Sequence, residues 1–257
     1  MSDQLDRPYL KEVTLVAVTS VALKATVDAL RASMQQVDFA EVLLLSDRPP
    51  VEQDPRINWQ RIDRLASRAD YSQFMLQGLA GHISTTHALC IQWDGFVLKG
   101  SAWKSEFLEY DYIGAVWPHF KDHYNVGNGG FSLRSRRLLD ACRNLEFDPR
   151  DGEDVIICRL QRPRLEAEGL RFAPEGVARQ FSYERTEASC KEFGFHGVFN
   201  LVEHVSRAHA LELLRCLEPG MLARSERWEL LRWALAHGQL RLAAAILGRL
   251  VQPELSK

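Results

Sequence analysis

The first third of the chain alternates apolar strands with helices, and this alternation constrains the fold more than any other feature. Short runs rich in β-branched and apolar residues predict buried strands at Val13–Val18, Val42–Leu45, Ile57–Ile62 and His87–Gln92. Helical spacing of apolar residues predicts helices over Val21–Met34 and Tyr71–Ile83. Strands and helices that alternate in this way form a mainly parallel sheet covered on both faces. We therefore expect an α/β fold, with Thr19 and Ser20 capping the first helix.

The end of the fourth predicted strand carries the first candidate site residue. Ligands of such sheets bind beyond the carboxyl ends of the strands, and the strand His87–Gln92 delivers Trp93 and Asp94 to that edge. An acid in this position either caps a turn or supplies an oxygen ligand to a divalent cation beside a diphosphate. The strand alone leaves both interpretations open.

A glycine-dense loop occupies the middle of the chain. Gly127, Asn128, Gly129 and Gly130 precede a basic segment that is interpreted as the start of an amphipathic helix. Glycine lets the backbone approach a ligand closely and adopt positive φ, so the loop can cradle a sugar or a phosphate. A tight turn before a helix is the equally supported alternative.

The segment before this loop is aromatic. Trp117, which precedes Pro118, is the best candidate for one wall of an acceptor site, although aromatic residues here are more often part of a core. The polar stretch His119–Tyr124 is interpreted as a loop over the site. His119 and His123 have the spacing of helical metal ligands, but the lack of a helical pattern favours exposure to solvent.

Two further places in the sequence carry side chains that can act in catalysis or metal binding, but each also has a purely structural explanation. Glu153 and Asp154 precede an apolar helix, where acids favour the helix dipole; alternatively, one of them is a catalytic base. His196 lies among glycines and aromatic residues, as either a packed histidine or a metal ligand. Between them, Phe172–Pro174 and Val177–Ser182 are predicted to be short strands.

Composition excludes several classes of protein. The 257 residues carry a formal net charge of -2, which argues against a nucleic-acid footprint. No apolar run approaches the roughly 20 residues of a membrane span. The polar, acidic start of the chain, Met1–Asp6, does not resemble a signal peptide. The five cysteines are scattered without a CxxC pair, so we expect reduced thiols and no structural zinc.

The last quarter of the chain has a purely helical pattern. Helices are predicted at His204–Leu217, Ser225–His237 and Leu240–Val251, with breaks at Pro219–Gly220 and Gly238. We therefore divide the chain into a catalytic or binding domain, residues 1–200, and a C-terminal helical segment, residues 201–257. Three roles are open for this segment: packing on the core, binding a protein partner or mediating a homodimer. Its arginines are interspersed with acids and are interpreted as a solvated face.

Four short motifs along the chain, taken together, resemble the GT-A class of nucleotide-sugar glycosyltransferases. They are Gln92–Asp94, Gly127–Gly130, Gly152–Asp154 and His196. The amino-acid sequence is also similar to that of a bacterial family of GT-A-like glycosyltransferases, in the segments Ile91–Val97, Phe107–Ala115 and Val126–Leu133. The resemblance covers roughly residues 10–200. It implies a GT-A-like, Rossmann-like fold: a mixed, mainly parallel sheet flanked by helices, here with a C-terminal helical appendage.

The resemblance also implies roles for individual residues. Asp94 matches the last acid of the metal-binding Asp-x-Asp motif, and Gln92 stands where the motif has its first Asp. His196 matches the late histidine that completes a Mn²⁺ or Mg²⁺ site. Asp154 matches the base of inverting members, and Glu153 would position the acceptor. Gly129 and Gly130 match the loop that lines the donor and acceptor sugars, and Thr19 of the first strand would face the nucleotide base. Trp93, Trp117 and Asn128 complete the expected donor- and acceptor-binding residues.

These roles imply a metal-assisted glycosyltransferase. The expected donor is a nucleotide-diphospho-sugar, UDP-linked, and the expected acceptor is a hydroxyl of a glycan or glycolipid, as in polysaccharide or lipopolysaccharide biosynthesis. The expected location is cytoplasmic, in solution or peripheral at the inner face of the membrane. The alternative is a non-catalytic nucleotide-sugar or glycan-binding module whose helical segment recruits a partner. A Rossmann dehydrogenase is disfavoured because no G-x-G-x-x-G follows the first strand.

Overall fold

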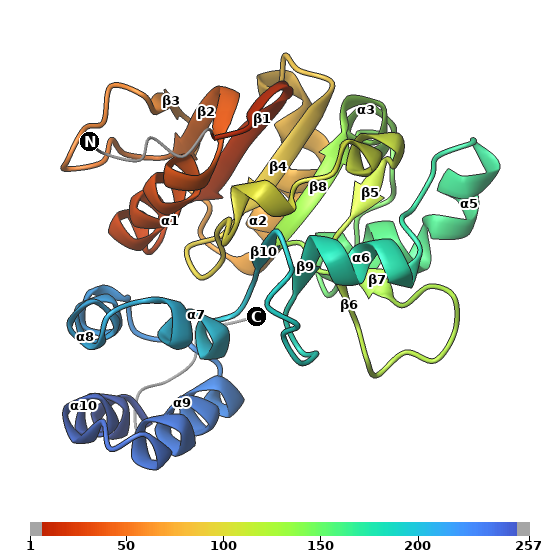
Figure 1. Cartoon of the computed structure of the whole chain (residues 1–257). Coiled ribbons are helices and arrows are strands. Elements are labelled where there is room, and N and C mark those ends of the chain that lie inside the picture. The colour runs from red at the N-terminus through yellow and green to blue at the C-terminus, as the bar shows by residue number, and fades with distance from the viewer. Residues whose placement is uncertain (1–6, 251–257) are drawn as a thin grey trace.

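The computed structural model describes residues 7–250, and a mixed, mainly parallel sheet forms its centre (Figure 1). In this part of the chain the main sheet has six strands in the order β3-β2-β1-β4-β8-β5. Its strands are β1 (Tyr9–Thr19), β2 (Asp38–Ser46), β3 (Asn58–Arg61), β4 (His87–Ile91), β5 (Tyr112–Ile113) and β8 (Phe131–Ser135). Strand β1 runs parallel to β2 and β4, and β8 runs antiparallel to β4 and β5. The α/β architecture expected from the sequence is therefore confirmed.

Two small ladders lie beside this sheet. One is antiparallel, between β6 (Ala115–Val116) and β7 (Val126–Gly127), and the other is parallel, between β9 (Ser182–Tyr183) and β10 (Gly194–Phe195). The segment between β6 and β7 contains the predicted loop His119–Tyr124. The parallel ladder matters for the site, because it places the residues that follow β9 and β10 side by side.

Helices cover both faces of the sheet, because alternate residues of each strand face opposite sides. Leu15 and Ala17 of β1 pack towards Leu30 of α1, whereas Val16 and Val18 pack towards Met75 beyond α2. The helices of this part are α1 (Leu23–Gln36), α2 (Arg68–Gln73), α3 (Arg136–Cys142), α4 (Glu153–Val155), α5 (Arg162–Ala167) and α6 (Glu175–Phe181). Helix α2 continues through Phe74–Gly78 and Leu79–His82, and α4 continues through Ile156–Leu160, with altered helical pitch.

The segment after the glycine loop differs from the sequence prediction. Phe131–Ser135 forms strand β8, between β4 and β5, and the helix α3 begins only at Arg136. All five residues of β8 are buried, including Arg134, which the sequence placed at the start of a basic, amphipathic helix. The expectation of a loop that leads directly into a basic helix was therefore wrong, because this segment has a sheet neighbour on each side.

Two smaller predictions were also wrong. Helix α1 is not capped by Thr19 or Ser20: its N-cap is Ala22, in the left-handed conformation with φ 48° and no side-chain cap. The hydroxyl of Ser20 instead accepts a hydrogen bond from the Leu65 amide at 2.9 Å. Val177–Phe181, predicted as a strand, belongs to helix α6, whose N-cap is Pro174. Proline before a helix and Glu175 in its first turn favour this helix over a strand.

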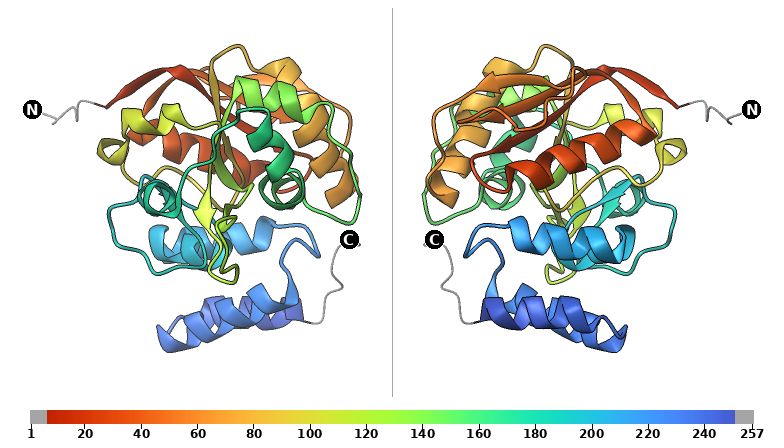
Figure 2. Two further views of the ribbon diagram at one scale, coloured as in Figure 1. Left: turned by 90° about the vertical axis from the view of Figure 1, so that its right-hand side faces the viewer. Right: turned by 90° about the vertical axis from the view of Figure 1, so that its left-hand side faces the viewer.

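The C-terminal helices form a layer below the sheet in both side views (Figure 2). They are α7 (Val198–His204), α8 (Arg207–Cys216), α9 (Arg224–Ala236) and α10 (Leu240–Leu250). Their apolar residues share one core cluster with Ala22 and Ala25 at the start of α1 and with Phe195 of β10. The helical segment therefore packs directly against the strand ends of the sheet.

Several sequence expectations about this segment stay predictions. The division at residue 200 and the contact with a homodimer partner or another protein are among them. Trp228, Leu235, Leu240 and Leu247 are exposed on α9 and α10.

In the described part of the chain, no helix has the length and apolar character needed to cross a membrane. The five cysteines form no disulfide within the described residues. The polar start Met1–Asp6 and the end of the last predicted helix, Val251, lie outside the described residues.

Candidate functional site

The carboxyl end of β4 forms one side of the candidate site. The backbone N–H of Gln92 donates to the carbonyl of Gly130 at 2.9 Å, so the end of β4 and the glycine loop are joined directly. The Gln92 side-chain amide donates to the Tyr71 hydroxyl at 3.0 Å, which turns its oxygen, Oε1, towards the site. Asp94 is 6% exposed, and it lies beside His196 rather than in an apolar interior.

The glycine loop has a fixed shape that depends on Asn128. This residue adopts φ 75°, a conformation that asparagine tolerates better than most residues. Its side-chain oxygen accepts the Gly130 N–H at 2.8 Å, and its backbone carbonyl accepts the Tyr112 hydroxyl at 2.9 Å. A Cβ on Gly130 would lie 2.0 Å from Nε2 of His196. The imidazole therefore packs on the bare backbone of the loop.

His196 is the centre of the polar contacts. Its Nε2 lies 3.2 Å from Oδ1 of Asp94 and 3.3 Å from Oε1 of Gln92. Its Nδ1 lies 3.2 Å from Oε1 of Glu184. Burial opposes protonation of the imidazole, but the carboxylates of Asp94 and Glu184 outweigh it and raise the pKa of His196 well above its ordinary value.

Asp154 contacts the other side of the glycine loop. Its Oδ2 accepts the backbone N–H of Gly129 at 3.0 Å, and its Oδ1 accepts the N–H of Val155 at 2.9 Å. The residue is half-buried at the start of α4. Because Gly129 touches Asp154 and Gly130 touches His196, two consecutive residues of one loop connect the two halves of the site.

Glu153 lies beneath the loop rather than on its open side. It is 5% exposed, and its Oε1 accepts from Nη2 of the fully buried Arg134 at 3.0 Å. Burial and the neighbouring charge of Asp154 raise the pKa of Glu153, whereas Arg134 lowers it. A Cβ on Gly129 would lie 2.0 Å from this carboxylate, so a glycine is required above the ion pair.

The donor atoms around His196 fit a divalent cation. Oδ1 of Asp94 is buried, and its only polar neighbour given for the described residues is Nε2 of His196 at 3.2 Å. In the described part of the chain, no three His, Cys, Asp or Glu residues gather as a metal site. Asp94, His196 and the amide oxygen of Gln92 nevertheless converge. Mg²⁺ and similar cations are often held by one or two protein groups together with waters and substrate phosphates, which suits such a partial set.

Other residues singled out by the sequence lie away from these contacts. Trp117 is 7% exposed and packs against Gly127 in the interior. The Thr19 hydroxyl accepts the Val21 N–H at 3.0 Å within its own turn at the end of β1. His119 and His123 are exposed between β6 and β7, which agrees with the solvent-exposed alternative.

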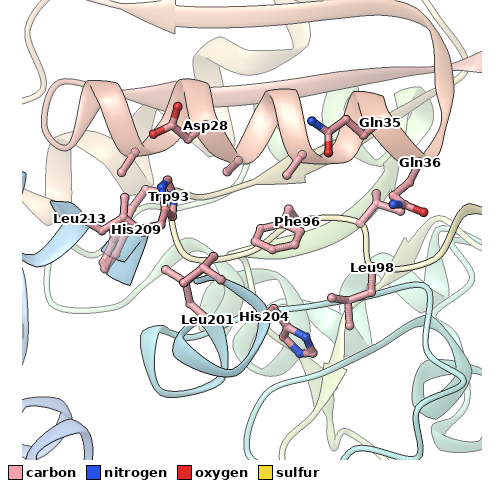
Figure 3. A pocket seen from close by; sticks show the side chains of 15 residues that line it. Asp28, Gln35, Gln36, Trp93, Phe96, Leu98, Leu201, His204, His209 and Leu213 are labelled. Atoms are coloured by element: carbon pink, nitrogen blue, oxygen red, sulfur yellow. The ribbon is translucent and has the colours of Figure 1, made fainter. Parts of the chain in front are cut away.

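Trp93 faces a separate cavity of about 390 Å³ (Figure 3). The cavity lies between α1 on one side and α7 and α8 on the other, with Phe96 and Leu98 at its wall. Asp28, His204 and His209 are among its polar lining residues. Asp94, Asp154 and His196 are absent from the lining described for this cavity, so Trp93 and Asp94 point to different spaces.

Sequence reasoning missed Glu184 and Arg134, which both contact the site. Glu184 is brought to His196 only by the pairing of β9 with β10, a long-range contact without a local signal. Besides Asp94 and Glu184, a further acid acts on this region, Glu226 at the start of α9. Burial and the charge of Asp94 raise the pKa of Glu226. The C-terminal helices therefore contribute to the electrostatics of the site.

Comparison with known sequences yields one family match. The profile of a family described as "Protein of unknown function (DUF5672)" matches residues 56–196. This range includes Gln92, Asp94, the glycine loop, Asp154 and His196, and it ends before α7. No curated protein matches the sequence.

Three matching solved structures are glycosyltransferases, at low identity. An active-site mutant of LgtC has a TM-score of 0.43 and 9% identity, covering 84% of this chain and 100% of that one. Apo GlyE of Streptococcus pneumoniae TIGR4 has a TM-score of 0.44 and 11% identity, covering 72% and 54%. The mannosyltransferase PcManGT of Pyrobaculum calidifontis, with GDP-Man and Mn²⁺, has a TM-score of 0.44 and 12% identity, covering 92% and 79%.

Proposed function

The chain belongs to the DUF5672 family of proteins of unknown function, and we propose that it is a glycosyltransferase. It transfers a sugar from a nucleotide-diphospho-sugar, UDP-linked, to a hydroxyl of a glycan or glycolipid, with inversion at the anomeric carbon. One observation carries the proposal. The glycine loop joins a half-buried carboxylate, Asp154, to a group of potential cation ligands around His196.

Asp154 is proposed as the general base. A base must first be placed and held, and two backbone N–H groups, of Gly129 and Val155, hold this carboxylate. A carboxylate has about four lone-pair directions, so these two hydrogen bonds leave acceptor capacity for an incoming hydroxyl. Glu153 is paired with Arg134 and therefore supports the loop from below in this proposal, while Asp154 faces the acceptor.

Asp94, His196 and Gln92 are proposed to hold Mn²⁺ or Mg²⁺ through Oδ1, Nε2 and Oε1. The cation, when bound, neutralises the charge of the departing diphosphate as a Lewis acid. The three protein groups orient the diphosphate end of the donor at the carboxyl end of β4, where ligands of α/β sheets bind. The bare backbone of Gly129 and Gly130 lets Glu153 and His196 pack against the loop, and the sugar is proposed to lie between Asp154 and His196.

The transfer is a direct displacement. The acceptor oxygen forms a bond to the anomeric carbon and passes its proton to Asp154. The bond between that carbon and the diphosphate oxygen breaks, and the nucleoside diphosphate leaves with the electron pair. Attack opposite to the leaving group inverts the anomeric carbon. Preorganised groups on both sides of the reacting carbon lower the barrier without large reorganisation.

The test combines a donor panel with one substitution. Thermal shift with nucleotide-sugars, with and without Mn²⁺, identifies the donor, and release of the nucleoside diphosphate then measures turnover. We expect Asp154→Asn to lower turnover about 100-fold or more, because general bases contribute at least this factor, while donor binding is kept. Asp151→Asn, which removes a nearby acid with no contact to the loop, is the matched control and should turn over normally.

A result against the base assignment is full turnover in Asp154→Asn. The alternative function, a non-catalytic nucleotide-sugar or glycan-binding module, draws support from Gln92, which replaces a carboxylate in the cation site. That alternative predicts a clear thermal shift with a donor and no nucleoside diphosphate release across the panel, hydrolysis included.

A further inference from the structure

Glu184 stands beside His196 because of the parallel ladder between β9 and β10. Tyr183 of β9 pairs with Phe195 of β10. Glu184 directly follows β9, and His196 directly follows β10. Oε1 of Glu184 lies 3.2 Å from Nδ1 of the imidazole. The Glu184 side chain is 18% exposed and that of His196 is 15% exposed, so the contact is largely screened from water.

The two nitrogens of the imidazole face different partners. Nε2 faces Asp94 and Gln92, whereas Nδ1 faces Glu184. Since the two nitrogens point away from each other across the ring, Glu184 is not placed to ligate the same ion as Asp94. A carboxylate that accepts the remote N–H of a metal-binding histidine fixes its tautomer and raises its basicity. We propose that Glu184 is a positioning residue, which retains the proton on Nδ1 and so leaves the Nε2 lone pair for the cation.

A competing donor makes this role necessary. The side-chain Nδ2 of Asn128 also lies 3.2 Å from Nδ1 of His196. The orientation of that amide is fixed, because its oxygen accepts the Gly130 N–H. If Nδ1 accepted a hydrogen bond from Asn128, the neutral ring would carry its proton on Nε2, and the cation site would be blocked. Hydrogen bonds to a charged acceptor are about twice as strong as neutral ones. In this proposal Nδ1 therefore donates to Glu184 and does not accept from Asn128.

The backbone geometry does not depend on the Glu184 carboxylate. The side-chain amide of Asn200 donates to the carbonyls of both Glu184, at 2.9 Å, and His196, at 2.7 Å. The ladder and this bridge therefore keep the two residues in place when the carboxylate is replaced. Glu184→Gln keeps the shape of the side chain, removes its charge and weakens its ability to accept the Nδ1 proton.

A matched control is available at Glu229, the ion-pair partner of the residue that follows Glu184. Arg185 pairs with Glu229 of α9 at 2.9 Å, and the Glu229 side chain is 40% exposed. Glu229→Gln changes the net charge by the same amount at the same corner of the fold. It has no contact with the imidazole, so a general charge effect appears in both variants and a tautomer effect appears only in Glu184→Gln.

The experiment measures Mn²⁺ binding to the full chain without donor, by electron paramagnetic resonance of the free ion. The inference rests on the proposed cation site, so His196→Ala is measured in parallel. We expect Glu184→Gln to weaken Mn²⁺ binding about 10- to 100-fold, as loss of such outer partners does elsewhere, with an unchanged melting temperature. Glu229→Gln should bind as the unsubstituted chain does.

A second readout follows the proton directly. With Mg²⁺ bound, ¹⁵N chemical shifts of His196 should show a protonated Nδ1 and an unprotonated Nε2 in the unsubstituted chain. In Glu184→Gln at the same Mg²⁺ concentration, a larger fraction of the protein should be free of the cation, and in that fraction the proton should lie on Nε2. Equal Mn²⁺ affinity of Glu184→Gln and the unsubstituted chain, with loss only in His196→Ala, overturns the role of Glu184 and leaves the proposed function intact. Absence of any effect in His196→Ala overturns both the cation site and this inference.

Discussion

Gly130 is the single residue on which the two halves of the site depend most closely. Its carbonyl accepts from Gln92, its N–H donates to Asn128, and its missing side chain makes room for His196. These three contacts come from the residue after β4, from the loop itself and from the residue after β10. A change of one methyl group at this position therefore tests the whole arrangement of the site.

We predict that Gly130→Ala loses Mn²⁺ binding and lowers turnover at least about tenfold while the protein remains folded. The added Cβ would lie 2.0 Å from Nε2 of His196 and displaces the imidazole from Asp94. Misplacement of a positioned group by about 1 Å is enough for a loss of this size or more. Mn²⁺ binding and nucleoside diphosphate release measure the effect, and circular dichroism checks the fold.

Gly176→Ala is the control for the same chemical change elsewhere. A Cβ on Gly176, in α6, meets nothing within 4 Å. We expect unchanged Mn²⁺ binding and a small gain in stability, because alanine favours a helix over glycine by up to about 1 kcal/mol. Equal effects of the two substitutions would show that the closeness of Gly130 to His196 has no functional weight.

Strand β8 and helix α4 are held together by a buried ion pair beneath the loop. Arg134 of β8 and Glu153 of α4 are both nearly inaccessible, and Arg134 also lies over the ring of Tyr112, 5.7 Å from its centroid. The Ser72 hydroxyl accepts the Glu153 N–H at 3.3 Å and so connects α2 to the same point. The orientation of Asp154, the next residue, is consequently set by these elements.

Breaking this pair should strongly destabilise the fold. We predict that Arg134→Met lowers the free energy of unfolding by about 3–5 kcal/mol, because it leaves the Glu153 carboxylate buried without its partner. Urea denaturation measures the change. The double variant Arg134→Met with Glu153→Leu should recover a large part of the loss, since no unpaired charge remains. A single variant with unchanged stability contradicts the assignment of a buried pair.

At the scale of the whole molecule, the C-terminal helices are tied to the ends of two strands. Glu218, between α8 and α9, accepts the Ala22 N–H at 2.8 Å and lies 3.7 Å from Nη2 of Arg48, just beyond β2. Lys24 of α1 also pairs with Glu212 of α8 at 3.1 Å. Together with the shared apolar cluster, these contacts argue that the helices unfold with the sheet.

We predict that Leu230→Ala lowers the free energy of unfolding of the whole chain by about 2–5 kcal/mol, the usual cost of such a cavity. Leu230 of α9 is fully buried in the cluster that contains Phe195. Circular dichroism and the fluorescence of single-tryptophan variants, with Trp103 near the sheet or Trp233 in α9, should give the same urea midpoint. Two separate midpoints would instead support an independent helical segment.

Much of this architecture was predictable because local and tertiary preferences agree. β1, β2 and β4 carry apolar runs that only a covered sheet can bury, and the structure confirms them. Strand β8 was missed because it includes Arg134, whose burial depends on a carboxylate 19 positions later. Glu184 was missed for a related reason: its meaning comes from a ladder between segments separated by an irregular stretch. Asp94, Asp154 and His196, which the sequence singled out, lie around one loop, whereas Trp93 and Trp117 lie away from it. Residues whose role depends on a distant partner were not predicted.

The position of β1 has a practical consequence for relatives of this chain. The family match begins at residue 56, yet β1 is hydrogen-bonded between β2 and β4 and precedes it entirely. A protein fragment cut to the matched range would expose one long edge of β4 to solvent, and such bare edges recruit other chains and promote aggregation. Expression trials in this family should therefore retain the residues upstream of the matched range, and insolubility of a trimmed fragment is no sign of an unstable protein.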